Sequence, residues 1–335
     1  MAETIPVFTP VNLLTGFLGS GKTTLLRRLL ADPALSGTAV LINEFGEVGL
    51  DHHLVERIDE TVVLLQSGCL CCTIRGELAL AIRDLHSRRE RGIVPAFGRL
   101  VVESTGLAEP FPILSTLKAD PVLRHHFRAA AVVTTVDAVN GLSQIERHSQ
   151  STRQVAAADR LVLTKTDLAD EKTVAKLLAQ ERRINPDAPV VGSGETDLDA
   201  DALLNRVGTA SEFHAPLMCD APNGDSHGTH IRSFVVTVEE PIDWTAFGVW
   251  LTMLLNRHGD KVLRVKGILN LAGEAAPVAI HAVQHLVHNP VHMARWPDED
   301  RRSHIVFIVD GIDPDLVRRS LTAFNALVTP QAERV

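Results

Sequence analysis

The sequence predicts an α/β protein in which a mostly parallel sheet, with helices on both faces, precedes a smaller α+β domain. Short apolar runs alternate with longer amphipathic stretches from residue 10 to about 210, which is the pattern of strands joined by helices. Several of these runs are apolar at consecutive positions. That feature is typical of strands buried on both faces of a parallel sheet.

The apolar runs predict seven strands in the first domain, which we expect to span residues 8–210. Because parallel strands end at the same edge of a sheet, ligands are expected at their carboxyl ends. The predicted strands are Val11–Leu14, Ala39–Ile42, Val62–Leu65, Leu100–Val102, Ala130–Val133, Leu161–Leu163 and Pro189–Val191.

A linker is predicted over residues 211–230, where prolines and glycines interrupt any apolar periodicity. A second domain is expected over residues 231–330, with helices on one side of its strands. The predicted strands are Ser233–Val238, Val262–Leu271, Val278–Val287 and Ile305–Val309, and the predicted helices are Trp244–Leu255 and Leu316–Leu327.

Composition narrows the classes of function. The chain has 335 residues, 45% hydrophobic content and a net charge of −8. The acidic balance argues against broad nucleic-acid binding, because no basic excess is available to neutralise phosphates. No apolar run approaches the ~20 residues that cross a bilayer, and the N-terminus lacks a signal-peptide layout. We therefore expect a cytoplasmic protein with neither nucleic acid nor membrane as a partner.

Residues 16–23 form a phosphate-binding motif, Gly-x-x-x-x-Gly-Lys-Thr, between a predicted strand and a predicted helix. Glycines let backbone N–H groups turn toward phosphates, Lys22 adds a positive charge, and the Thr23 hydroxyl can ligate Mg²⁺. The motif predicts the fold of P-loop NTPases. Its expected nucleotide-binding residues are Gly16, Gly19, Ser20, Gly21, Lys22, Thr23 and Thr24.

Glu103 ends an apolar run and precedes Ser104-Thr105-Gly106. A carboxylate at the end of a strand beside the phosphate loop can hold Mg²⁺ through water or orient the attacking water. Lys22 and Glu103 are therefore the predicted catalytic residues, and Thr23 and Glu103 the predicted Mg²⁺ site. The alternative is that residues 103–106 only cap a helix.

The run Thr164-Lys165-Thr166-Asp167 follows another buried strand. Asp167 can accept hydrogen bonds from the N1–H and N2–H₂ edge of guanine, which adenine does not offer, while the stem of Lys165 covers the base. GTP is thus favoured over ATP. Thr164 stands where the usual guanine motif has Asn, so the amide that normally braces the phosphate loop is absent, and weaker selectivity is expected.

Three cysteines lie within four positions, at Cys69, Cys71 and Cys72. A turn could gather their thiolates around one ion, and thiolates favour Zn²⁺ or a neighbouring soft metal such as Co²⁺. The alternative is a set of small buried side chains. An acidic loop over residues 43–53 could sense the γ-phosphate. Its Glu44 or Glu47 could reach Mg²⁺ or the thiolate-bound metal. The alternative is an ordinary surface loop.

Four histidines, His281, His285, His288 and His292, are spaced as on one helical face. The segment 278–287 also alternates between apolar and polar residues and is rich in β-branched side chains, which favours a strand. We therefore interpret these histidines as exposed sheet residues or a client surface rather than as metal ligands.

Taken together, these signatures resemble the CobW-like family of metal-chaperone GTPases. The likeness spans nearly the whole chain. It rests on Gly16–Thr23, on residues 43–49, 68–73, 103–110 and 164–167, and on residues 264–269 and Trp296 in the second domain.

The resemblance implies GTP hydrolysis coupled to delivery of Zn²⁺, Co²⁺ or a related ion to a client metalloprotein. A homodimer is one option for the assembly. No arginine finger is assignable, so slow basal turnover is expected. Two alternatives stay open: a P-loop kinase that phosphorylates a small substrate, and a zinc-binding scaffold that works without nucleotide.

Overall fold

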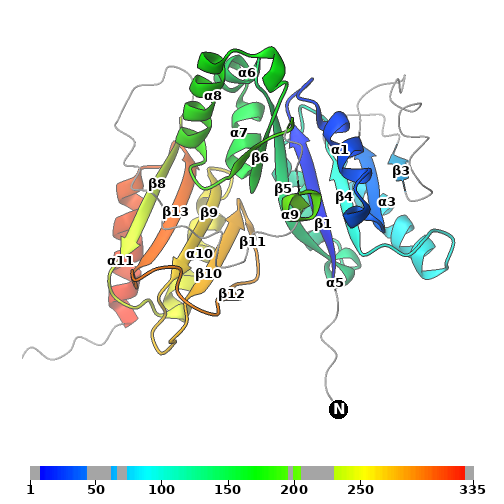
Figure 1. The fold of residues 1–335 in the computed structure, drawn as a ribbon. Coiled ribbons are helices and arrows are strands. Elements are labelled where there is room, and N and C mark those ends of the chain that lie inside the picture. The colour runs from blue at the N-terminus through cyan, green and yellow to red at the C-terminus, as the bar shows by residue number, and fades with distance from the viewer. Residues whose placement is uncertain (1–7, 44–61, 66–73, 195–198, 205–229, 329–335) are drawn as a thin grey trace, which may run out of the picture. The chain divides into compact units, whose positions relative to one another are not determined.

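The chain divides into two compact units, residues 1–179 with 188–206 and residues 180–187 with 207–335. The computed structural model describes residues 8–43, 62–65, 74–194, 199–204 and 230–328 (Figure 1). All of the predicted linker except His230 lies outside the described residues. The expected domain limits therefore stay predictions.

The first unit is built on a parallel sheet of seven strands in the order β3-β2-β4-β1-β5-β6-β7. Each predicted apolar run of this unit forms a strand, which confirms the expected fold class. The central position of β1 places the loop that follows it at the middle of the carboxyl edge. The strands are β1 Thr9–Gly16, β2 Thr38–Asn43, β3 Val62–Leu65, β4 Arg99–Glu103, β5 Phe127–Asp137, β6 Arg160–Thr164 and β7 Val190–Gly192.

Helices cover both faces of this sheet. One face carries α1 and α9, whose leucines share a core cluster with Leu14, Val40 and Val101. Leu13 and Leu41 alternate with those positions and are equally buried, and α4 and α7 contact β1 and β5. The helices of the unit are α1 Lys22–Leu30, α3 Ile74–Glu90, α4 Pro110–Ala119, α5 Leu123–His126, α6 Gly141–Arg147, α7 Ser149–Ala157 and α9 Ala200–Leu204. Helix α8, Glu171–Ile184, begins in this unit, and its residues from 180 onward belong to the second.

A β-bulge interrupts the pairing of β1 with β5. Val11 pairs with Ala129 but Leu13 pairs with Val132, so two residues of β5 oppose one of β1. The buried Asn12 side chain fills the gap, because its Oδ1 accepts a hydrogen bond from the Ala131 N–H at 3.1 Å. A buried backbone donor that the bulge removes from the ladder is thus paired again.

The second unit is built on an antiparallel sheet in the order β11-β10-β9-β13-β8, with β12 paired to β10. Helices α10 (Trp244–His258) and α11 (Pro314–Val328) share its main core, in which Trp250 lies edge-on to Phe307. This confirms the α+β prediction. The strands are β8 Ile231–Val238, β9 Val262–Leu269, β10 Val278–Val283, β11 Leu286–Val287, β12 Val291–His292 and β13 Ser303–Asp310.

One predicted strand, Val278–Val287, is wrong as a single element. It is a tight hairpin, because Val283 of β10 pairs with Leu286 of β11 and Gln284 turns the chain with a φ of 49°. Alternation alone does not reveal such a turn, since a two-residue loop preserves the period of two on either side. The strand interpretation of this segment is nevertheless confirmed over the helical one. The expectation that all four histidines are exposed sheet residues is wrong in part, because His281 and His288 are half-buried and only His281 and His292 lie in strands.

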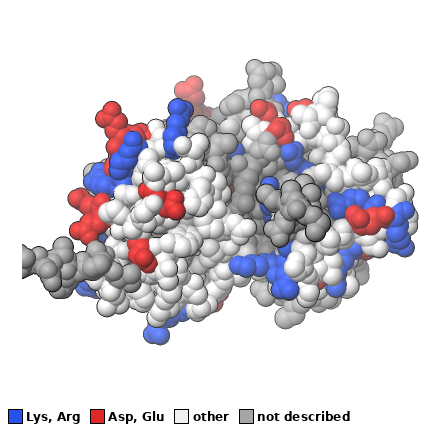
Figure 2. Space-filling view, turned by 90° about the horizontal axis from the view of Figure 1, so that it is seen from below, with Lys and Arg blue, Asp and Glu red and all other residues white. Residues whose placement is uncertain are grey.

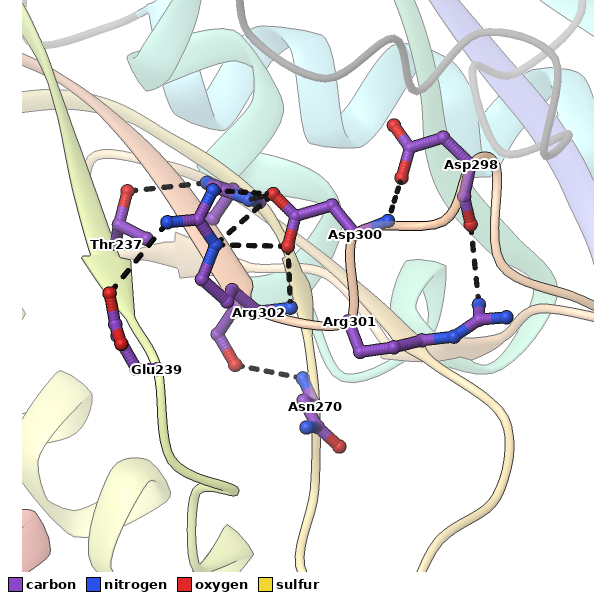
Figure 3. Close-up of polar contacts among 9 residues, drawn as sticks. Thr237, Glu239, Asn270, Asp298, Asp300, Arg301 and Arg302 are labelled. Atoms are coloured by element: carbon purple, nitrogen blue, oxygen red, sulfur yellow. Dashed lines mark hydrogen bonds and ion pairs between the residues drawn. The ribbon is translucent and has the colours of Figure 1, made fainter.

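A polar cluster holds the segment before β13 against the end of β8 (Figure 3). Asp300 accepts hydrogen bonds from the Arg302 guanidinium and from His304 Nε2. These bonds, with the Arg302 guanidinium contributing most, hold the pKa of Asp300 well below its usual range. Arg302 also lies 3.7 Å from Glu239. The cluster thereby fixes where β13 begins.

The described surface carries mixed charges. On the face shown in Figure 2, Lys and Arg side chains are interspersed with Asp and Glu. Within the described ranges, no helix is both long enough and apolar enough to cross a membrane.

Candidate functional site

The phosphate loop connects β1 to α1 and depends on its glycines. Gly16 has a φ of 141°, and a Cβ there would lie 2.3 Å from Thr135 Oγ1. Gly19 and Gly21 also have positive φ values, 73° and 85°, and Gly21 is the N-cap of α1. No other residue fits such a path without strain. The loop therefore presents backbone N–H groups at a helix N-terminus, as an anion site requires.

Lys22 reaches back over this loop. Its Nζ donates hydrogen bonds to the carbonyls of Gly16 at 3.0 Å and Phe17 at 3.2 Å. The side chain is only 9% exposed, so its charge acts in a partly desolvated setting, where attraction to a phosphate is strengthened. Thr24 lies in the first turn of α1 and is exposed.

Thr23 and Glu103 meet across the sheet. The Thr23 hydroxyl donates a hydrogen bond of 2.7 Å to Glu103 Oε1, and Glu103 is 4% exposed. Two oxygens at this separation beside the phosphate loop fit the needs of Mg²⁺, which binds through a hydroxyl, a carboxylate and phosphate oxygens. The helix-cap alternative does not explain why the carboxylate points at Thr23.

The phosphate loop is braced from two neighbouring strands. Ser20 Oγ lies 2.7 Å from Thr135 Oγ1 of β5, and the Thr164 hydroxyl donates a 2.8 Å hydrogen bond to the Ser20 carbonyl. The amide of the usual motif is absent as expected, but the Thr164 hydroxyl braces the loop in its place, and weaker selectivity stays a prediction. A hydroxyl reaches the carbonyl because Thr164 ends β6 directly beside the loop, where the Gly21 Cβ position is only 3.4 Å from its methyl group.

Lys165 links the phosphate loop to an aspartate that the sequence analysis did not identify. Its Nζ donates to the Gly19 carbonyl at 2.7 Å and to Asp137 Oδ2 at 2.6 Å. Asp137 also accepts hydrogen bonds from the backbone N–H groups of Val139 and Asn140. Burial by itself would raise the pKa of Asp137, but the bonds from Lys165 and from residues 139–140 outweigh it and hold this pKa below its ordinary value.

Asp137 had a signal in the sequence, because it is the carboxylate that ends the longest apolar strand. Lys165 itself adopts a left-handed conformation with a φ of 56°, which costs about 1 kcal/mol or more for a residue with a side chain. The ion pair compensates for that strain. Asp167 follows in a short 3-10 turn, Thr166–Leu168, and is exposed.

The expected metal ligands Glu44, Cys69, Cys71 and Cys72 lie outside the described residues. Within the described ranges, no three His, Cys, Asp or Glu side chains gather as a metal site. His281 and His288 do meet, with ring centroids 4.6 Å apart and planes inclined by 7°. Parallel stacked rings direct their nitrogen lone pairs side by side rather than toward one ion.

The phosphate loop, its lysine and the Thr23–Glu103 pair define a P-loop nucleotide-binding protein. Residues 10–192 match the CobW/HypB/UreG nucleotide-binding domain, and residues 231–325 match the cobalamin synthesis protein cobW C-terminal domain. The chain therefore belongs to the CobW family.

Similar proteins agree with this assignment. The chain is 37% identical over 324 residues to the zinc chaperone YjiA of Escherichia coli, covering 94% of this chain and 98% of YjiA. It is 28% identical over 351 residues to the zinc chaperone CobW of Pseudomonas aeruginosa, covering 93% and 90%. The crystal structure of Zn(II)-bound YjiA GTPase from E. coli superposes with a TM-score of 0.71 at 31% identity, covering 96% of this chain and 99% of YjiA.

Proposed function

We propose that this protein is a GTP-hydrolysing metallochaperone that binds Zn²⁺, or a related ion such as Co²⁺, and delivers it to a client metalloprotein. The observation that carries the proposal is the similarity to a zinc chaperone over 94% of the chain. The assembled nucleotide site of the first unit supports it.

The nucleotide site would work as follows. The N–H groups of the phosphate loop and the Lys22 ammonium hold the β- and γ-phosphates, and Mg²⁺ held by Thr23 with Glu103 would supply charge neutralisation. A water oxygen attacks the γ-phosphorus, the bond to the β–γ bridging oxygen breaks, and GDP and inorganic phosphate leave. Glu103 would hold the ion through water or orient the attacking water.

Base selection would fall to the turn that follows β6. Asp167 accepts the two donors of the guanine edge while Lys165, held by Asp137 and Gly19, covers the base. A site built around a hydrogen-bonding edge rejects a base without it, because its own polar groups then lose their partners. This favours GTP over ATP and argues against the kinase alternative, which gives Asp167 no role.

The cargo ion would bind at Cys69, Cys71 and Cys72. A structural zinc site is worth ~10–16 kcal/mol, which is too much for a carrier that must release its ion. We propose that GTP orders the loop around Glu44 and completes the thiolate site, and that hydrolysis relaxes it. Moving such a two-state element from nearly closed to nearly open takes ~5.5 kcal/mol of differential binding.

Metal affinity should therefore depend on the nucleotide. Competition titrations of the whole chain with a chromophoric chelator are expected to show at least tenfold tighter Zn²⁺ binding with a non-hydrolysable GTP analogue than with GDP. Lys22→Ala should bind Zn²⁺ but lose this dependence, and Cys71→Ala should lose Zn²⁺ binding. Equal affinities with both nucleotides would contradict the coupling and favour the scaffold alternative.

A further inference from the structure

Helix α7 touches both segments that lie beside the phosphate site. His148, at its N-cap, stacks on Phe17 of the phosphate loop with ring centroids 4.7 Å apart. Gln154, in its second half, donates from Nε2 to the carbonyls of Gly106 at 3.1 Å and Ala108 at 3.0 Å. One helix thus contacts the loop after β1 and the segment after β4.

The segment after β4 lies against the phosphate loop. It begins directly after Glu103, which bonds Thr23, and this pair would hold a Mg²⁺ ion that neutralises phosphate charge. Gly106 lies against the phosphate loop, because a Cβ there would come within 2.6 Å of the Leu18 backbone nitrogen. A displacement of Gly106 would therefore change the contacts of the phosphate loop and so the binding of phosphates.

Gln154 holds this segment from a buried position. Its side chain is 1% exposed, its own carbonyl oxygen accepts from Thr134 Oγ1 at 3.0 Å, and its side-chain Oε1 has no hydrogen-bond partner among the described residues. Both N–H donors of the Gln154 amide are thus used on the carbonyls of residues 106 and 108. These two hydrogen bonds hold the amide in this orientation although its acceptor oxygen stays unpaired within the described part of the chain. Arg153 adds a second link, 3.7 Å from Glu109.

We propose that Gln154 is a positioning residue for GTP hydrolysis, which couples helix α7 to residues 104–109 and sets the preference of the site for GTP over GDP. This inference rests on the proposed GTPase function. Gln154 does not touch the nucleotide. It acts by keeping the Gly106 backbone where a γ-phosphate contacts it, so its loss should affect the triphosphate and leave the diphosphate nearly unchanged.

The test compares Gln154→Met with wild type and with Gln150→Met, a change one turn earlier in α7 that removes neither contact. We expect Gln154→Met to bind GDP within about threefold of wild type. Its kcat for hydrolysis and its affinity for a non-hydrolysable GTP analogue relative to GDP should each fall roughly 10-fold or more, since about 1.4 kcal/mol is a factor of ten. Gln150→Met should change neither.

A second variant separates positioning from loss of packing. In Gln154→Glu, a carboxylate faces two carbonyl oxygens, and only its protonated form donates a hydrogen bond. The hydrolysis rate of this variant relative to wild type should rise as pH is lowered from 8.5 to 6. A ratio that stays flat with pH would overturn the proposal, and so would an unchanged analogue-to-GDP affinity ratio in Gln154→Met.

Equal weakening of GTP and GDP binding in Gln154→Met would also overturn it, because Gln154 would then support only the fold. The affinity ratio tests the coupling without hydrolysis. A wild-type protein that binds both nucleotides but releases no phosphate would thus refute the GTPase proposal separately.

Discussion

The Thr164 hydroxyl donates a hydrogen bond to the Ser20 carbonyl at 2.8 Å, and so joins the end of β6 to the phosphate loop. The Val136 carbonyl lies 3.2 Å from the same hydroxyl. All three groups are buried, so water cannot replace the Thr164 hydroxyl as the donor to these carbonyls. The contact means that base-side and phosphate-side elements of the site are held together without the usual asparagine.

Thr164→Val keeps the side-chain shape and removes this donor. Affinity for GTP should fall roughly 3- to 10-fold, because a buried hydrogen bond contributes about 1 kcal/mol. Titration with a fluorescent GTP analogue measures the change. Thr173→Val, which removes the hydroxyl that bonds Asp170 on the surface of α8, is the matched control. Wild-type affinity in Thr164→Val would mean that the brace is dispensable.

Asp137→Asn puts an amide donor where the Lys165 ammonium now finds a carboxylate. Hydrogen bonds to charged groups contribute about 1.5–3 kcal/mol, so the ratio of GTP to ATP affinity should drop roughly 10-fold or more as Lys165 loses its anchor. Competition between the two nucleotides measures this ratio. Asp170→Asn, at an exposed turn before α8, should leave it unchanged. An unchanged ratio of GTP to ATP affinity in Asp137→Asn would mean that Asp137 is not what holds Lys165 in place.

Glu103→Gln tests which of two roles the carboxylate plays. Loss of the charge should lower kcat roughly 100-fold or more, while GDP affinity changes little. If Glu103 holds Mg²⁺, the Mg²⁺ concentration needed for half-maximal rate should also rise; if it orients water, only kcat should fall. Glu146→Gln, an exposed carboxylate of α6 that the site does not use, is the control. Full activity in Glu103→Gln would remove it from the catalytic residues.

Glu181, in α8, is fully buried, and its two carboxylate oxygens find no hydrogen-bond partner among the described residues. Burial raises the pKa of Glu181 to about 8 from an ordinary value of 4.5. Between these values the unfolded chain has released a proton that the folded chain retains. The free energy of unfolding contributed by this group therefore decreases as pH rises through that window.

Glu181→Gln should remove this dependence. Its stability gain over wild type is expected to grow from pH 4.5 to 8 and then level off, reaching on the order of 4 kcal/mol. Denaturant unfolding at several pH values measures the difference. Glu171→Gln, exposed on the same helix, should show no such trend. A constant difference across the window would mean that Glu181 is ionised in the folded protein.

Sequence patterns predicted the elements of the first unit well. Each apolar run forms a strand, because a strand that is apolar at consecutive positions is buried on both faces, as in a sheet covered by helices on both sides. The glycines at 16, 19 and 21 predicted a loop with positive φ angles, which glycine adopts without strain. The second unit was predicted less closely, since the turn at Gln284 carries neither Gly nor Pro and leaves the alternation of β10 and β11 intact.

The sequence by itself determined the strands, the phosphate loop and the residue types that can bind phosphate, Mg²⁺ and guanine, because these follow from local composition and spacing. Only the tertiary structure decided how they are held. Thr164 reaches Ser20 across 144 positions, Lys165 reaches Asp137 across 28, and Gln154 reaches Gly106 across 48. Such contacts depend on the order of the strands in the sheet and on which faces pack together. The spacing of residues along the chain predicts neither.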